Sequence, residues 1–448
     1  MKLATPVQRQ FAPATRRIPS VVGAGLMVPL ATGSRTQYAN LDHAASAPCL
    51  SSVQTVVGEL LPWYASVHRG AGFASQVSTR IYEQARDVLR EFVGARPADA
   101  VIFTRNTTDS LNLLARSLPE STSVLLFDTD HHAALLPWQG PRVHRIKTPL
   151  TAAATVVALD RALAAAAKGP RLVVVTGASN VTGELWPVAE LAGVAHRHGA
   201  RVVLDAAQLA PHRPIDIQAL NVDYVALSGH KLYAPFGAGV LIGRADWLQN
   251  AEPYLAGGGA TKQVVPGENK LGVDWCAVPE RHEAGSPNVV GVHALAAACT
   301  TLSAQWPEIE AHERALLRQL RVGLHQVPGL AELTIFEGPR VGVVSFTIKG
   351  HDAGLLAAVL SAEYGIGVRD GAFCAHIATR RLLAKAGSSE QRALRASLGL
   401  GTTSEHIGRL VNALHTLVNH GPALNYRLDD GRWVPEHDTR PMPSFLFS

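Results

Sequence analysis

Charged residues are scarce in this chain: they make up 17% of its 448 residues, against about a quarter in average globular proteins. Hydrophobic residues reach 47%, which excludes a disordered polyelectrolyte and allows a large core. The lysines and arginines are scattered and form no run, so we expect no nucleic-acid partner. No apolar run reaches the roughly 20 residues that a bilayer span needs, so we expect no membrane segment.

Cysteine is also rare. Four cysteines, Cys49, Cys276, Cys299 and Cys374, lie far apart and form no CxxC pair. This spacing argues against a disulfide scaffold and a zinc ribbon, and no other pattern predicts a metal site. The reducing cytoplasm is therefore the compartment that we expect.

The two ends of the chain carry little pattern. Arg16-Arg17 precedes a mildly apolar stretch, as in a twin-arginine export signal. Pro19 and Pro29 interrupt that stretch and no small-residue cleavage site follows it, so we expect an irregular leader over residues 1–37. Residues 422–448 are polar, rich in proline and aperiodic, and we expect an irregular tail on the surface.

Short runs rich in β-branched residues alternate with amphipathic helical stretches in the first large part of the chain. Such strands, buried on both faces and joined by helices, predict an α/β domain with a mostly parallel sheet over residues 38–304. The expected strands are Val101–Thr104, Val124–Asp128, Leu172–Thr176, Val202–Asp205, Tyr224–Ser228 and Val240–Gly243.

A smaller α+β domain is expected over residues 305–421. Its pattern predicts three helices, near residues 307–326, 352–363 and 404–419. Two strands are expected between them, at 343–348 and 366–369. Because ligands of α/β sheets bind beyond the carboxyl ends of the strands, the residues at those ends are the first candidates for a site.

Lys231 and Asp205 are such residues. Lys231 follows a strand in a chain with only eight lysines, and partial burial would lower its pKa and make it a usable amine nucleophile. Asp205 closes an apolar strand, where a carboxylate needs a positive or protonated partner. Taken singly, Lys231 could also be an ordinary surface lysine, and Asp205 an ordinary helix N-cap. Together they match the demands of pyridoxal 5'-phosphate, an imine-forming lysine and a counter-charge for the ring nitrogen.

A phosphate needs a cradle of donors, and the start of the helix after the 101–104 strand offers one. Thr107 and Thr108 stand there with free backbone N–H groups. Ser228 and His230, next to Lys231, carry further donors. Ordinary helix capping would use the two threonines equally well.

Several ordered motifs resemble those of the class V aminotransferases, specifically the branch of cysteine desulfurases and selenocysteine lyases. The resemblance runs from about Tyr38 to Leu417. The matching segments are 41–46 (LDHAAS, similar to LDNAAT), 67–70 (VHRG), 103–108 (FTRNTT, similar to FTRGTT), 130–133 (DHHA, similar to EHHAN), 179–183 (SNVTG, similar to SNVLG), 205–208 (DAAQ, similar to DGAQ), 228–231 (SGHK), 283–288 (EAGSPN, similar to EAGTPN) and 394–398 (LRASL, with the family's RASL).

The resemblance implies fold type I, with a seven-stranded sheet, and a role for each matching residue. Lys231 would carry the internal aldimine and move protons, and His131 would stack on the ring. Asp205 would pair with the ring nitrogen, and Gln208 would bond the phenolic oxygen with Asn180 nearby. The residues expected to hold the phosphate are Thr107, Thr108, Ser228, His230 and, across the interface of a homodimer, Ser286.

The resemblance also implies which residues would bind the substrate. Arg395 would grip the carboxylate of a small amino acid, with Ala44 and Asn180 beside it. Cys374, in the segment 368–375 (VRDGAFCA, similar to VRAGHHCA), falls on the position of the desulfurase nucleophile. A thiolate there would take the sulfur as a persulfide, release alanine and pass the sulfur to an acceptor protein.

Two features leave alternatives open. Ala372 and Phe373 replace the two histidines of the motif, and His376 stands where a proline follows it. An aminotransferase, epimerase or β-lyase in which Cys374 is not a nucleophile therefore stays an alternative to the desulfurase. A third hypothesis is a cofactor-free binding protein on this fold.

Overall fold

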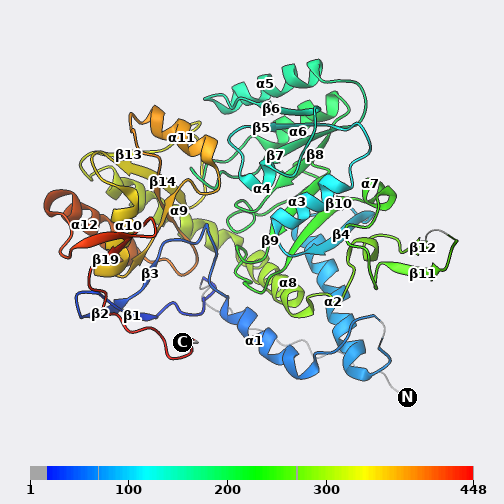
Figure 1. Ribbon diagram of the computed structural model, residues 1–448, viewed down its shortest axis with the longest axis horizontal. Helices are drawn as coiled ribbons and strands as arrows, with labels where there is room; N and C mark the ends of the chain where they lie inside the picture. The colour runs from blue at the N-terminus through cyan, green and yellow to red at the C-terminus, as the bar shows by residue number, and fades with distance from the viewer. Residues whose placement is uncertain (1–17, 69, 269–270, 447–448) are drawn as a thin grey trace.

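The structure, a computed structural model, describes residues 18–68, 70–268 and 271–446. The Arg16-Arg17 pair and Arg69 of the VHRG segment lie outside the described residues. In the described part the chain forms a larger and a smaller lobe (Figure 1).

A seven-stranded sheet forms the centre of the larger lobe. Its strands are β4 (Asp99–Thr104), β5 (Ser123–Phe127), β6 (Val143–Ile146), β7 (Arg171–Thr176), β8 (Arg201–Asp205), β9 (Tyr224–Ser228) and β10 (Gly239–Arg244). The spatial order is β4-β10-β9-β8-β7-β5-β6. β10 runs antiparallel to its two neighbours and every other pair is parallel, so the predicted mostly parallel α/β sheet is confirmed.

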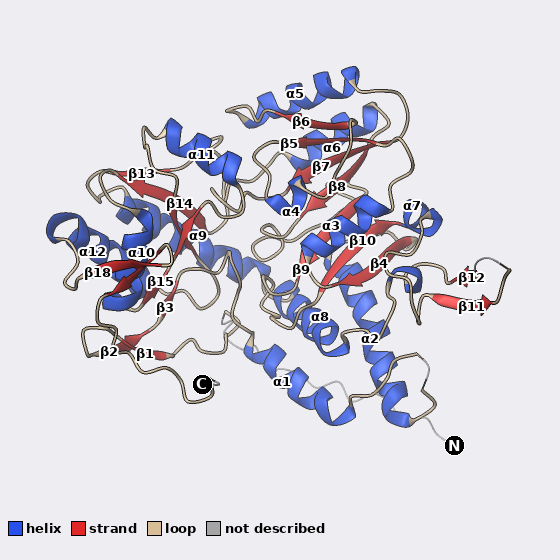
Figure 2. Cartoon of the chain, viewed as in Figure 1, coloured by secondary structure: helices blue, strands red, loops and turns tan. Residues whose placement is uncertain are grey.

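Helices cover both faces of this sheet (Figure 2). One face packs against α1 (Ser51–Leu60), α2 (Phe73–Phe92), α5 (Ala152–Ala165), α6 (Val188–Arg197) and α8 (Val289–Ser303). The other packs against α3 (Thr107–Arg116), α4 (His132–Leu135) and α7 (Ala245–Asn250). Along β7, Val173 and Val175 join the first cluster while Leu172 and Val174 join the second. This alternation explains why the strands are apolar throughout.

The smaller lobe holds an antiparallel four-stranded sheet with helices packed on it. Its strands, in spatial order, are β13 (Leu330–Glu332), β14 (Val343–Ile348), β17 (Ala393–Ser397) and β16 (Arg369–Gly371). Its helices are α9 (Trp306–Leu324), α10 (Ala353–Tyr364), α11 (His376–Lys385) and α12 (Ser404–His420). The single strand expected at 366–369 is divided into β15 (Ile366–Gly367) and β16.

The N-terminal segment is more ordered than expected. Within the predicted irregular leader, β1 (Met27–Pro29) and β2 (Arg35–Gln37) form a hairpin, which turns at Gly33 with a φ of 90°. The next strand, β3 (Ala39–Asn40), pairs in parallel with β15. These first strands therefore lie with the smaller lobe (Figure 1).

The expectation of an irregular C-terminal tail is wrong for residues 426–435. There β18 (Tyr426–Asp429) and β19 (Arg432–Pro435) form a hairpin on α10. Asp430 and Gly431 turn it with φ values of 47° and 72°, and Asp-Gly is a favoured pair for that conformation. A further hairpin, β11 (Thr261–Val265) and β12 (Gly272–Trp275), projects from the larger lobe (Figure 1).

None of the described helices combines the length and apolar character that a bilayer crossing requires. The parallel strands point their carboxyl ends toward the smaller lobe (Figure 1). Asp205 and Ser228, two of the residues singled out from the sequence, are the last residues of β8 and β9.

Candidate active site

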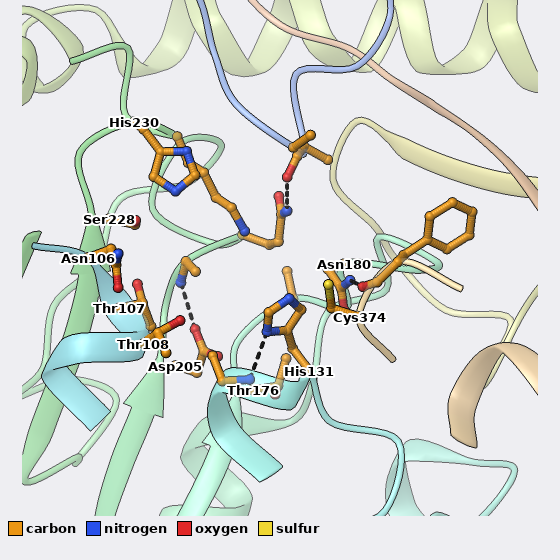
Figure 3. Close-up of a pocket in the computed structure, with 18 of the residues that line it drawn as sticks. Asn106, Thr107, Thr108, His131, Thr176, Asn180, Asp205, Ser228, His230 and Cys374 are labelled. Atoms are coloured by element: carbon orange, nitrogen blue, oxygen red, sulfur yellow. Dashed lines mark hydrogen bonds between the residues drawn. The ribbon is translucent and has the colours of Figure 1, made fainter. Parts of the chain in front are cut away.

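A cavity of about 320 Å³ lies where the strand ends meet the smaller lobe. It gathers the predicted site residues from segments far apart in the chain (Figure 3). Those that line it are Ala44, Thr107, Thr108, His131, Asn180, Asp205, Gln208, Ser228, His230, Lys231, Cys374 and Arg395.

Lys231 stands three residues after the end of β9, and its backbone N–H donates to Ser228 O at 3.2 Å. Burial lowers the pKa of Lys231 to about 8, although the carboxylate of Asp205 acts in the opposite direction. About a tenth of the amine is therefore unprotonated at pH 7, far more than in a lysine of ordinary pKa, and the unprotonated amine is the form that reacts to give an imine.

Asp205 is the last residue of β8 and is buried, with a side chain 5% exposed. Its Oδ1 accepts a hydrogen bond from Ala207 N at 3.0 Å, and burial raises its pKa. Next to it in register on β7, Thr176 donates from Oγ1 to Asp130 Oδ1 at 2.9 Å. Burial raises the pKa of Asp130 to about 7. Below neutral pH, Asp130 is therefore mostly protonated and adds little negative charge next to Asp205.

His131 caps the short helix α4. Its Nδ1 accepts from Ala133 N at 3.0 Å, so in the neutral ring the proton is on Nε2. Burial and the nearby charge of Lys231 lower the pKa of His131 to about 3. A neutral, planar imidazole at the cavity wall is suited to stacking on an aromatic ring. Burial likewise lowers the pKa of His230 to about 4.

The N-terminus of α3 forms one end of the cavity, with Asn106, Thr107, Thr108 and Ser228 gathered there (Figure 3). Asn106 caps the helix through Oδ1, which accepts from Asp109 N at 3.0 Å. Thr107 Oγ1 is buried and has no hydrogen-bond partner among the described residues. Free N–H groups, an unused hydroxyl and the helix dipole make this end of the cavity chemically suited to an anion.

Arg395 lies on β17 and is only 4% exposed, which excludes a surface arginine. Its guanidinium donates from Nη1 to Asn180 O at 3.0 Å and from Nη2 to Asp42 Oδ1 at 3.2 Å. Nε is buried and lacks a partner in the part of the chain that the structure describes. Burial lowers the pKa of Arg395, yet the group stays charged and keeps donors for a carboxylate.

Cys374 is the exposed member of the four cysteines and also lines the cavity. It lies on the same side of the cavity as Asn180 (Figure 3). Its φ of 53° follows a φ of 54° at Phe373, and two successive left-handed residues without glycine need support. That support is visible: Phe373 O accepts from Asn180 Nδ2 at 2.6 Å, and Cys374 O accepts from His132 N at 2.8 Å.

Ser286 is the one predicted site residue that the fold does not bring to this cavity. It lines a second cavity of about 560 Å³, together with Tyr64, His68 and Glu283. A contact of Ser286 with the first cavity would have to come from another copy of the chain.

Sequence reasoning missed three residues of the site. Asn106 and Thr176 line the cavity, and Asp42 holds both Arg395 and, through Oδ2 at 3.0 Å, Arg369 Nε. Thr176 ends a strand, and the rule of strand ends would have found it. The pairing of Asp42 with an arginine more than 300 residues later leaves no signal in a single sequence.

Comparison with known proteins identifies a family that the chain matches. The family model described as Aminotransferase class-V matches residues 39–410. A cysteine desulfurase of Klebsiella pneumoniae (strain 342) is 36% identical over 397 residues, covering 85% of this chain and 93% of that one. A cysteine desulfurase of Dickeya dadantii (strain 3937) is 36% identical over 394 residues, with coverage of 85% and 92%.

Solved structures are similar as well. The apo cysteine desulfurase from Thermococcus onnurineus NA1 superposes with a TM-score of 0.77 at 30% identity, covering 91% of this chain and 99% of that one. A cysteine desulfurase of Escherichia coli in an S-sulfonic acid form gives a TM-score of 0.72 at 30% identity, with coverage of 85% and 95%.

Proposed function

Since the chain belongs to the class V aminotransferase family, we propose that it is a cysteine desulfurase that uses pyridoxal 5'-phosphate. It cleaves the C–S bond, or C–Se bond, of L-cysteine or a similar small amino acid and releases alanine. The observation that carries the proposal is the position of Cys374, which shares one cavity with Lys231 and Arg395.

The residues of the cavity fit this cofactor. Thr107 Oγ1 and Gln208 Oε1 are buried without partners among the residues described, at places that suit a phosphate and a ring substituent. Lys231 would hold the cofactor covalently, Asp205 would keep its ring nitrogen protonated, and His131 would cover its face. When bound, pyridoxal phosphate supplies an electron sink for the bond cleavage.

The chain's own residues orient the substrate and move protons. Arg395 binds the α-carboxylate, with Asn180 and Ala44 beside it. Lys231, with a pKa near 8, is suited to take and return a proton at the substrate carbon atoms. The helix start at Thr107 and Thr108, with Ser228 and His230, binds the phosphate.

Cys374 acts as the sulfur acceptor. Its thiolate attacks the sulfur of the substrate, the Cβ–S bond breaks, and the electron pair stays with the carbon skeleton, which leaves as alanine once protonated. Cys374 keeps the sulfur as a persulfide. Its exposure at the mouth of the cavity suits the delivery of that sulfur to an acceptor protein.

The test is product release from L-cysteine in the presence of a thiol reductant. We expect equal amounts of alanine and sulfide, and we expect Cys374→Ala to lower turnover by about 100-fold or more because the nucleophile is gone. Cys276→Ala is the matched control, since Cys276 is not among the lining residues of the cavity. Full turnover in Cys374→Ala would remove the persulfide step and leave an aminotransferase, epimerase or β-lyase, and release of pyruvate would identify the lyase.

The assembly proposed is a homodimer in the cytoplasm. Ser286 lies outside the cavity of its own chain, which supports a role for it in the site of a second copy. Tyr64 lines the same cavity as Ser286 and is about half exposed, as are Leu61 and Trp63 just before it in the chain, which is expected of a surface that a partner covers. Four free thiols support a reducing compartment.

A further inference from the structure

Three residues form a closed set of contacts at the substrate end of the cavity. Asn180 Nδ2 donates to Phe373 O at 2.6 Å, and Asn180 O accepts from Arg395 Nη1 at 3.0 Å. The set closes through the ring of Phe373, whose centroid lies 5.0 Å from the guanidinium carbon of Arg395. Each of the three residues therefore fixes the other two.

Phe373 is itself held firmly. It is 8% exposed and packs in a hydrophobic cluster with Val181, Leu333 and Leu382. Phe373 is also one of the residues that line the cavity, so it lies at the boundary between that cluster and the cavity. A rigid aromatic face at this place covers the guanidinium and leaves the edge donors of Arg395 for a carboxylate.

The ring of Phe373 affects how strongly Arg395 can bind a carboxylate. A guanidinium–carboxylate pair is stronger where water is excluded, and the ring removes water from one face of the cation. The motif that segment 368–375 resembles has a histidine at the place of Phe373. A polar ring there would bring its own hydrogen-bonding groups and water to the guanidinium.

We propose that Phe373 is a positioning residue for Arg395, which it covers and orients so that the site selects small amino acids by their α-carboxylate. The inference rests on the part of the proposed function that gives Arg395 the substrate carboxylate. Phe373 directly precedes Cys374. Its contact with Arg395 therefore also fixes the distance between the carboxylate site at Arg395 and the sulfur acceptor, Cys374.

The test is the affinity of the holoenzyme for L-alanine, measured by titration calorimetry. We expect Phe373→Ala to weaken binding by about tenfold, the scale of a desolvated cation–π contact, and Phe373→Tyr to keep the affinity within about twofold. In an Arg395→Lys background, Phe373→Ala is expected to cost less than about twofold, because contacts that act through one residue are not additive.

Phe336→Ala is the matched control, since Phe336 packs against the same cluster and is absent from the lining of the cavity. Phe373→His serves as a second variant should the alanine variant fold poorly, and we expect it to weaken L-alanine binding as well. Unchanged affinity in Phe373→Ala and Phe373→His, or losses that add fully to that of Arg395→Lys, would overturn the inference. Sulfide release from L-cysteine by the wild type is measured separately: binding through Arg395 without sulfide release would refute the proposed function and leave the role of Phe373 standing.

Discussion

At the scale of single residues, burial sets the charge state of the groups around the cavity. It lowers the pKa of Lys231 to about 8 and that of His131 to about 3, while it raises the pKa of Asp130 to about 7. The imidazole of His131 is therefore neutral at physiological pH, and the amine of Lys231 is close to its titration point. This is the state in which an amine can capture an aldehyde while a neutral ring stacks beside it.

The pH dependence of cofactor capture follows from the pKa of Lys231. Only the unprotonated amine reacts, so the rate at which apoenzyme binds pyridoxal phosphate is expected to rise with pH and to level off above about pH 8. The measurement is the stopped-flow rate of the new absorbance band across that range.

The control is a free lysine amine, whose pKa of about 10.4 would keep the rate rising past pH 10. A capture rate for the apoenzyme that also climbs to that pH would contradict the lowered pKa. A flat rate from about pH 6 upward would place the pKa of Lys231 far lower than the structure indicates.

Much of the site was predictable at this scale because of one geometric rule. Asp205, Ser228 and Lys231 stand at the carboxyl ends of buried strands, where sequence alone places them together. Asp42 and Phe373 were not predictable in the same way. Both residues contact Arg395, which is distant from Asp42 in the sequence. The contacts form only when the strands of the smaller lobe pair, and a single sequence does not show which strands pair.

At the scale of elements, one buried carboxylate ties the two lobes together beside the site. Glu184 is fully buried in the loop after β7 and accepts from Ile335 N at 2.6 Å, Phe336 N at 2.9 Å and Glu337 N at 2.6 Å. The same loop carries Asn180. Glu184 therefore holds the segment before β14 against the loop that contacts Arg395.

We expect Glu184→Gln to lower the free energy of unfolding by about 3 kcal/mol, because an amide loses the charge and directs its own N–H groups at backbone donors. Chemical denaturation measures the loss. Glu190→Gln, on the exposed side of α6, is the matched control and should stay within about 0.5 kcal/mol. Equal stability of both variants would show that Glu184 does not bind the two lobes together.

Elements differed in how well the sequence predicted them. Six of the seven strands of the central sheet were predicted within about two residues, because burial on both faces makes each a continuous apolar run. The edge strand β6 was not predicted, since it is only partly buried. The three hairpins were missed, since their strands are short and mostly exposed, with no apolar periodicity. For β18 and β19, the Asp430-Gly431 pair was a usable signal that was overlooked.

At the scale of the whole molecule, the site exists only where the two lobes meet. The strand ends of the larger lobe supply Lys231 and Asp205, and the smaller lobe supplies Arg395 and the loop of Cys374. The N-terminal strand β3 joins the smaller lobe through β15, which places Asp42 beside Arg395. In the described chain, the residues proposed to hold the cofactor lie mainly in the larger lobe, and Arg395, proposed to bind the substrate, lies in the smaller one.

The proposed homodimer predicts complementation between two defective chains. Lys231→Ala removes the amine, and Ser286→Asp would place a negative charge against the phosphate of the neighbouring site. If Ser286 reaches across the interface, a mixed dimer has one intact site, and random pairing restores about a quarter of wild-type activity. The measurement is sulfide release after co-expression. No recovery in the mixture would confine Ser286 to its own chain.

The proposed function depends first on a covalent bond between Lys231 and pyridoxal phosphate. The most direct measurement is borohydride reduction of freshly purified holoenzyme, followed by mass spectrometry of its peptides. We expect a phosphopyridoxyl group on Lys231, and no such group in the reduced Lys231→Ala variant. An unmodified Lys231 in protein prepared with added vitamin B6, or the label on another of the eight lysines, would contradict it.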